Sequence, residues 1–180
     1  MPKIYLSPSV KEYEEYINGG TEEQYMNLIA DAMEPYLIAS GIDFDRSRPT
    51  QTLTEIINQV NSGDYDFYLG IHSSSAPPAL AGWLRGTNVY YWYGNRWGRE
   101  GADIIADNLS RIYPDSEKVK SVATSTMREV RRNNAPSAVV EIIYHDNAED
   151  VEWLKENIDE VAKTLVLSLT EYFGIPFVEG

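Results

Sequence analysis

The chain has 180 residues, of which 43% are hydrophobic and 24% are charged, and its formal net charge is −13. This length and apolar content are enough to bury one sizeable core, so we expect one domain. The negative charge argues against binding to nucleic acid or to an anionic membrane surface. The chain has no cysteine, which excludes disulfides, thiolate metal sites and cysteine nucleophiles. Any metal ligands must therefore be His, Asp or Glu.

The first two predicted elements are a strand and a capped helix. Residues 3–6 are apolar and are followed by Ser-Pro-Ser, a pattern typical of a strand that runs into a loop. A capping box at residues 21–24 marks the start of a helix, and Gly41 marks its end. On this helix we expect one apolar stripe to face the core, formed by Tyr25, Ile29, Ala32 and Tyr36.

The remaining predicted elements also alternate between strand and helix. Residues 66–72 and 137–144 are almost continuously apolar, as expected for strands buried on both faces between helices. The alternation predicts an α/β fold with a single domain, in which helices cover both faces of a mostly parallel twisted sheet. Ligands bind such sheets at the carboxyl ends of the strands. The other expected strands are 42–44 and 87–93, and the other expected helices are 51–61, 98–113 and 127–133, followed by more than one helix over 148–172.

Glu141 is the candidate with the clearest chemical signal. It lies in the middle of the apolar run 137–144, where burial would remove the hydration of its charge. Burial also raises the pKa of a carboxyl group, which suits a general acid or base that works near neutral pH. The alternative is a purely structural ion pair with Arg131 or Arg132.

The two histidines, the first turn of the capped helix and an aromatic block supply further candidates. His72 ends a buried strand, where a neutral imidazole either binds zinc or only forms a hydrogen bond at the strand boundary. Glu23 lies in the first turn of the helix, where acidic residues mostly serve the cap and the helix dipole. For His145 we expect a role at the next helix start or in supporting other site residues, in preference to direct metal binding. The aromatic residues within 90–97 line a sugar or peptide groove or pack in the core.

Six short motifs follow one another along the chain. They are Ile4-Tyr5-Leu6-Ser7-Pro8-Ser9, Gly20-Thr21-Glu22-Glu23, Gly70-Ile71-His72-Ser73, Gly86-Thr87-Asn88-Val89-Tyr90-Tyr91, Ala135-Pro136-Ser137-Ala138-Val139-Val140-Glu141 and Asp146-Asn147. In this order they resemble the family-3 N-acetylmuramoyl-L-alanine amidases, and in particular the short clostridial-type members. The resemblance spans nearly the whole chain. It implies that residues 1–180 form a single amidase-like catalytic domain with a phosphorylase/hydrolase-like fold.

The resemblance also implies a function and a set of site residues. It implies a hydrolase that degrades the cell wall, with Zn²⁺ as cofactor and peptidoglycan or muropeptide as substrate. The bond cut would be the amide between N-acetylmuramic acid and L-alanine of the stem peptide. By position, Glu23 and His72 would bind the metal. Glu141 would take a proton from the zinc-bound water and pass it to the leaving amine.

One position departs from the family pattern. Where the family has its first histidine ligand, this chain has Ser9-Val10. Catalytic zinc usually takes three protein ligands and a water molecule. A neighbouring side chain would therefore have to complete the site, and the candidates are Glu12, Glu14, Glu15 and His145.

Two other functions stay open. One is a non-catalytic amidase-like module that binds muropeptide or a protein partner, although such a module has no need to keep Glu141 inside an apolar strand. The other is a metal-free hydrolase in which Glu23 and Glu141 act as a carboxylate pair. The first apolar run is too short for a signal peptide, so nothing in the chain predicts its export. The resemblance implies that the site of action is the cell wall.

Overall fold

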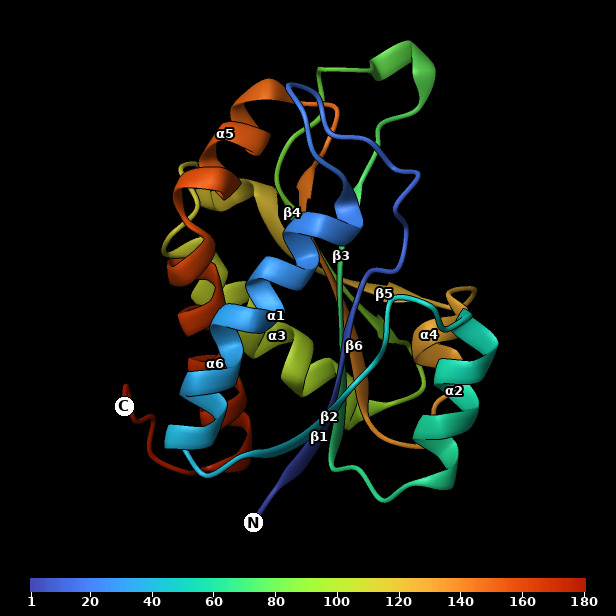
Figure 1. Cartoon of the computed structure of the whole chain (residues 1–180), viewed down its shortest axis with the longest axis vertical. Coiled ribbons are helices and arrows are strands. Elements are labelled where there is room, and N and C mark those ends of the chain that lie inside the picture. The colour runs from blue at the N-terminus through green and yellow to red at the C-terminus, as the bar shows by residue number, and fades with distance from the viewer.

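Six strands form one sheet in the computed structural model, which describes residues 1–180 (Figure 1). The strands are β1 (Lys3–Pro8), β2 (Asp43–Arg46), β3 (Phe67–Ser74), β4 (Thr87–Trp92), β5 (Val119–Thr124) and β6 (Ser137–Tyr144). Their order across the sheet is β2-β1-β3-β6-β4-β5. All neighbouring pairs are parallel except β4 and β6, which are antiparallel. The prediction of a single-domain α/β fold with a mostly parallel sheet is confirmed.

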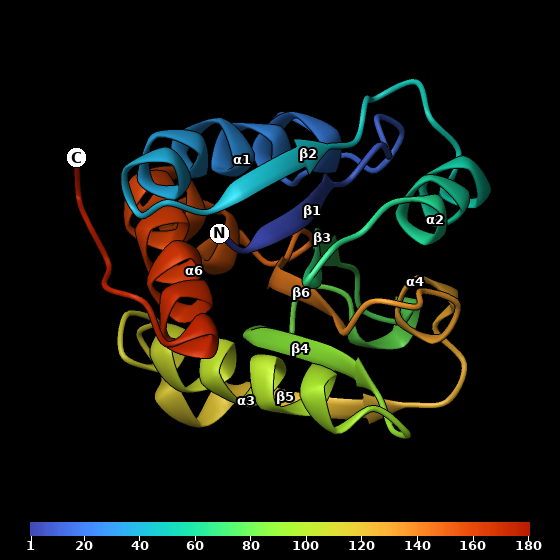
Figure 2. The same ribbon diagram turned by 90° about the horizontal axis from the view of Figure 1, so that it is seen from below.

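Helices cover both faces of this sheet. They are α1 (Glu22–Ala39), α2 (Leu53–Ser62), α3 (Arg96–Ser110), α4 (Arg128–Arg131), α5 (Ala148–Glu156) and α6 (Ile158–Phe173), with short 3-10 helices η1 (Pro78–Leu80) and η2 (Ser116–Lys118). α1, α3 and α6 lie on one face, over a core cluster of 29 buried residues, whereas α2 and α4 lie on the other face over a cluster of six (Figure 2). None of these helices combines the length and apolar character needed to cross a membrane.

The rotation of α1 about its axis decides which of its side chains reach the sheet. Thr21 caps the helix, because its hydroxyl accepts a hydrogen bond of 3.2 Å from the Gln24 backbone N–H. Of the predicted apolar stripe, Ile29 is fully buried, and Tyr25, Ala32 and Tyr36 are partly buried and pack against the same core cluster. Glu22 lies one helical turn before Met26 and is therefore on the buried face. The apolar side chains that face the core are Met26, Ile29, Ala30, Met33 and Leu37.

Two features of β4 and β5, which form one edge of the sheet, were not expected from the sequence. β5 is an edge strand with no fully buried residue, so it lacks the apolar run that marks the inner strands. Because β4 runs antiparallel to β6, the start of β4 lies beside the carboxyl end of β6, and Asn88 is opposite Glu141. The loops that follow β1 and β3 lie at the same end of the molecule as the carboxyl end of β6 (Figure 1).

Candidate active site

His72 and Glu141 lie beside each other on neighbouring strands. The parallel register of β3 and β6 pairs the two residues directly. Side chains alternate between the faces of a strand, so His72 is on the same face as Tyr68, which belongs to the cluster beneath α2 and α4. The two predicted site residues thus come together near the carboxyl ends of β3 and β6, where α/β sheets bind ligands.

The imidazole of His72 is held between two carboxylates. Its Nδ1 is 3.1 Å from Oε2 of Glu22 on α1, and its Nε2 is 3.0 Å from Oε2 of Glu129 on α4. The side chains of Glu22, His72 and Glu129 are 1%, 16% and 10% exposed, so water screens these charges little. Tyr68 donates a hydrogen bond of 2.7 Å to the same oxygen of Glu129. The three charged side chains are called the Glu–His–Glu cluster below.

The Glu–His–Glu cluster is ionised at neutral pH. Burial alone would lower the pKa of His72, but the charges and hydrogen bonds of Glu129 and Glu22 outweigh this effect and raise it to about 10. Burial alone would raise the pKa of Glu22 and of Glu129, but the His72 charge and hydrogen bonds hold both below their usual range. The neutral imidazole considered in the sequence analysis is therefore replaced by an imidazolium.

Glu141 differs from these carboxylates because it forms no ion pair. Burial raises its pKa above the usual range for a glutamate, although the nearby positive charge of His72 acts in the opposite direction. The alternative of a structural pair with Arg131 or Arg132 is not seen, since both arginines are exposed. Glu141 is therefore a buried carboxyl group whose pKa is shifted upward, as expected of a group that exchanges protons with a substrate.

The structure brings Glu22, and not Glu23, to His72. Glu23 is only half-buried, and its Oε1 is 3.5 Å from Nδ2 of Asn27 on the same helix. The physical reason is the helical rotation described above, which turns Glu22 toward the sheet and Glu23 toward the loop that follows β1. In this site Glu22 has the position that the sequence analysis gave to Glu23.

Glu129 is the site residue that the sequence analysis missed. Its carboxylate lies directly against β3 at Gly70, where an added Cβ would clash with Oε2 of Glu129 and would be 3.0 Å from Cγ2 of Val139. A glycine inside a strand often marks such a close approach. Gly70, in the middle of a buried apolar strand, was the one available signal for this carboxylate.

We expect Gly70→Ala to lower the free energy of unfolding by about 1–3 kcal/mol, because the new methyl group forces Glu129 to move within a packed site. Urea denaturation of the variant measures this loss. The same substitution in a Glu129→Ala background should be markedly less destabilising, since the clashing carboxylate is gone. An equal loss in both backgrounds would contradict the close approach.

His145 takes the supporting role that the sequence favoured. It is 5% exposed and stacks on Tyr16, with ring centroids 5.5 Å apart. Its Nδ1 is 2.9 Å from Oγ of Ser73, and that hydroxyl donates a hydrogen bond of 3.1 Å to Glu22. Its Nε2 is 3.5 Å from a carboxylate oxygen of Glu14. His145 therefore supports the far side of the Glu22 carboxylate through Ser73, and Asn147, two residues further along the chain, caps α5.

Two pockets meet at Glu141. The first, of about 210 Å³, is mainly apolar and lies between the sheet and helices α2 and α4. The second, of about 300 Å³, is mainly polar and lies toward the loops that follow β1 and β3. The first is lined by Ser7, Pro8, Val10, Lys11, Leu53, Ile56, His72, Met127, Glu129, Val139 and Glu141. The second is lined by Lys11, Glu14, Glu22, Ser73, Ser74, Ser75, Pro77, Leu84, Tyr90, Glu141, Tyr144 and His145.

Of the aromatic residues within 90–97, some line a pocket and others pack in the core. Tyr90 lines the polar pocket, where burial and then the Glu141 charge raise its pKa to about 12. Tyr91 is 9% exposed and belongs to the core, whereas Tyr93 is exposed. Only part of the block is therefore available to a ligand.

The side chains present do not fit a zinc site with three protein ligands. No group of three or more His, Asp or Glu side chains is arranged to hold a metal ion. Nδ1 of His72 and Oε2 of Glu22 lie next to each other, but both ring nitrogens of His72 are paired with carboxylates. A metal ion would have to displace the proton and one of the two carboxylates from His72 in order to bind it.

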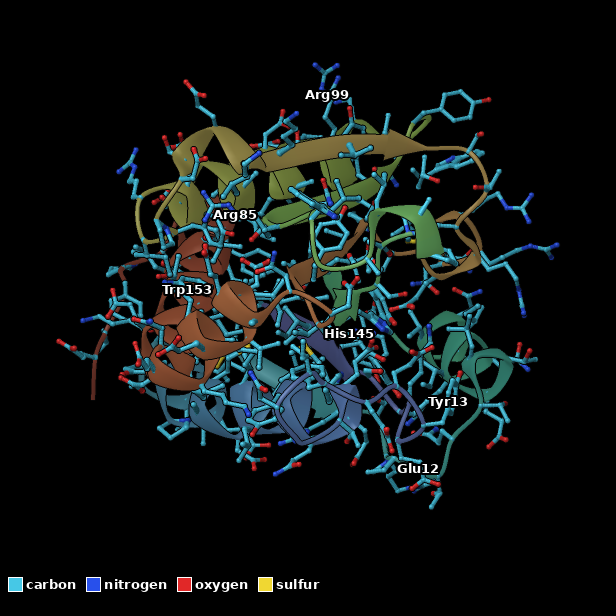
Figure 3. All side chains as sticks on the ribbon, turned by 90° about the horizontal axis from the view of Figure 1, so that it is seen from above. Glu12, Tyr13, Arg85, Arg99, His145 and Trp153 are labelled. Atoms are coloured by element: carbon cyan, nitrogen blue, oxygen red, sulfur yellow. The ribbon has the colours of Figure 1, made fainter.

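The four candidates for the missing ligand do not complete the site. Glu12 and Glu15 are exposed, and Glu12 lies at the edge of the molecule in the view from above (Figure 3). Glu14 contacts His145, and Nδ1 of His145 is 3.8 Å from the Glu22 oxygen that does not contact His72. Glu14 and His145 thus lie on the side of Glu22 that faces away from His72 and do not converge with His72 on one point.

Comparison with known proteins gives one family and a consistent fold. Residues 11–171 match the family model described as N-acetylmuramoyl-L-alanine amidase. A comparison with curated proteins gives no match. The match to the family model covers most of the chain and includes every residue of the two-pocket site from Lys11 onward.

Three solved structures illustrate the similarity of fold. The amidase AmiC2 of Nostoc punctiforme is 16% identical with a TM-score of 0.82, covering 96% of this chain and 97% of that one. The CwlD amidase of Clostridioides difficile, in complex with the GerS lipoprotein, is 13% identical with a TM-score of 0.85, covering 97% and 99%. The amidase Ami1 of Mycobacterium smegmatis is 17% identical with a TM-score of 0.80, covering 96% and 97%. At these identities the likeness shows the fold alone.

Proposed function

The chain belongs to the N-acetylmuramoyl-L-alanine amidase family, and from this premise we propose that it hydrolyses the amide bond between N-acetylmuramic acid and L-alanine in peptidoglycan. The observation that carries the proposal is the position of Glu141. It is a carboxylate with a raised pKa and no ionic partner, and it borders both pockets of the site. A substrate that fills both pockets presents the bond between its two parts to this carboxylate. Its site of action would be the cell wall.

Glu141 moves the proton in this reaction. Its carboxylate accepts a proton from a water molecule that attacks the carbonyl carbon, and it then delivers the proton to the leaving nitrogen of L-alanine. A carboxyl group whose pKa is raised by burial is a better base than an exposed one, and it is also able to return the proton.

The His72 imidazolium supplies a positive charge that is fixed in position next to Glu141. It lies beside Glu141 in the register of β3 and β6, and it is the positive charge fixed most firmly in the site. A fixed positive charge in a partly buried site stabilises negative charge that develops on the carbonyl oxygen. Glu22 and Glu129 keep the imidazolium protonated and hold its ring in place.

Zinc dependence is implied by the resemblance to the family, but the residues argue against a zinc site of the family's kind. We therefore expect calorimetric titration of the metal-stripped protein with zinc to show no tight one-to-one binding. His72→Ala should give the same trace as the unsubstituted chain. Tight binding that disappears in His72→Ala would contradict this expectation and would mean that the Glu–His–Glu cluster opens to admit the metal.

One observation favours a second candidate function, a non-catalytic module that binds muropeptide. Ser9-Val10 stands where the family pattern has its first histidine ligand, and both ring nitrogens of His72 are paired with carboxylates. This module would bind a muropeptide without cleaving it. The third possibility, a carboxylate pair of Glu23 and Glu141, has no support, because Glu23 lines neither pocket.

A further inference from the structure

Lys11 has an unusual place in this acidic protein. It lines both the apolar and the polar pocket, and it is the only lysine or arginine that lines either of them. The chain as a whole carries a net charge of −13, and four glutamates line the two pockets. An anionic group that enters the site therefore meets one mobile cation, the ammonium group of Lys11.

The backbone of Lys11 is fixed while its side chain is free. The Lys11 N–H donates a hydrogen bond of 3.1 Å to Oγ of Ser9, and its carbonyl oxygen accepts bonds of 3.4 Å from the N–H groups of Glu14 and Glu23. The residue is exposed, and its ammonium group is in none of the ion pairs or side-chain hydrogen bonds of the protein. Lys11 thus lies at the boundary between the pockets, and its ammonium group has no committed partner.

A simpler role for Lys11 would be to balance the charge of the site. Its positive charge does help to lower the pKa of Glu22 and of Glu129, but it is the last of the causes in both cases. His72 already lies in direct contact with both of these carboxylates. Charge balance therefore does not account for a lysine placed within reach of both pockets and in contact with neither carboxylate.

The two pockets suit the two halves of a muramoyl peptide. The hydroxyl groups of Ser75 and Tyr144 in the polar pocket match the hydroxyl and acetamido groups of a sugar. Val10 and Ile56 in the apolar pocket match the methyl group of L-alanine. The next peptide residue in peptidoglycan is D-isoglutamate, whose α-carboxyl group is either free or amidated and lies only a few bonds from the cleaved nitrogen.

We propose that Lys11 binds the free α-carboxylate of the second peptide residue and so makes the site selective for stem peptides that are not amidated at this position. The inference rests on the proposed function, because it uses the same two pockets and the same boundary at Glu141. Lys11 is a specificity residue in this scheme and takes no part in proton transfer.

The test compares two substrates that differ only at this group, N-acetylmuramoyl-L-alanyl-D-isoglutamate and N-acetylmuramoyl-L-alanyl-D-isoglutamine. We expect the KM for the carboxylate to be about fivefold lower, as for one solvent-accessible ion pair, with similar kcat values. Lys11→Gln should remove this preference by raising the KM of the carboxylate substrate alone, and Lys11→Arg should keep it. Lys120→Gln, which removes an exposed lysine on β5, is the matched control and should behave as the unsubstituted chain.

A calorimetric arm separates the failure of this inference from the failure of the proposed hydrolysis. Both compounds are titrated into Glu141→Gln protein, with and without Lys11→Gln. Preferential binding of the carboxylate that depends on Lys11 supports the inference even when neither compound is cleaved. Equal affinities for the two compounds, or a preference that survives Lys11→Gln, would overturn it while leaving hydrolysis intact.

Discussion

Glu141→Gln is expected to lower hydrolysis of the muramoyl–L-alanine amide by about 10²- to 10⁴-fold, the usual contribution of a general acid–base group. The substitution keeps the size of the side chain and removes only its ability to exchange a proton. Because burial raises the pKa of Glu141, the charged form of this group is less favourable in the folded protein than in the unfolded chain. The variant should therefore be at least as stable as the unsubstituted chain at neutral pH.

The control for this prediction is Glu100→Gln, which removes an exposed carboxylate on α3 that forms no ion pair. It should leave both activity and thermal stability unchanged. Rates are measured with a soluble muropeptide, and folding is followed by circular dichroism of the same samples. A Glu141→Gln protein that turns over within a few-fold of the normal rate would rule out Glu141 as the proton-transfer group.

His72→Ala is expected to lower the free energy of unfolding by about 3–5 kcal/mol. The substitution leaves Glu22 and Glu129 buried without their shared cation, and an uncompensated buried charge is strongly destabilising. Glu129→Gln should have a smaller effect, because His72 keeps Glu22 as a partner. Denaturant unfolding at pH 7 gives both values, and a nearly neutral His72→Ala would contradict the Glu–His–Glu cluster.

The cluster also predicts how stability changes with pH. The pKa of His72 rises from its ordinary 6.5 to about 10 on folding, so its contribution is fully present below pH 6.5 and is lost as the pH rises toward 10. The pKa values of Glu22 and Glu129 fall on folding, so their contribution is present above their ordinary value of 4.5 and is lost in acid.

Unfolding of the unsubstituted chain and of His72→Ala at pH 6 and at pH 9.5 separates the His72 contribution from those of other groups that titrate in alkali. The difference in stability between the two proteins should shrink at the higher pH. A difference that stays constant would mean that the folded state does not hold His72 as an imidazolium.

The fold could be read from the sequence wherever burial leaves a continuous apolar run. β3 and β6 have such runs, and both were predicted close to their observed bounds. β5 could not be predicted from the sequence, because an edge strand needs no continuous apolar run. The direction of β4 was also out of reach, since it depends on which strand β4 pairs with and not on its own residues.

The candidate site was predictable in part for a related reason. Glu141 and His72 stand out because each interrupts or ends an apolar strand. Glu22 and Glu23 are adjacent acidic residues, and only the rotation of α1 set by its tertiary packing separates them. Glu129 lies on a helix of four residues, too short to show a periodic pattern, and Gly70 marks its position only once the two elements are known to touch.

The central claim is that this chain cleaves the muramoyl–L-alanine amide by using Glu141. The most direct test is mass spectrometry of a purified muropeptide after incubation with the protein, in parallel with Glu141→Gln. The account predicts two new products, a peptide with a free amino-terminal L-alanine and a sugar that keeps its lactyl group, both absent with the variant. An intact muropeptide that nevertheless binds the protein would contradict the claim and identify a non-catalytic binding module.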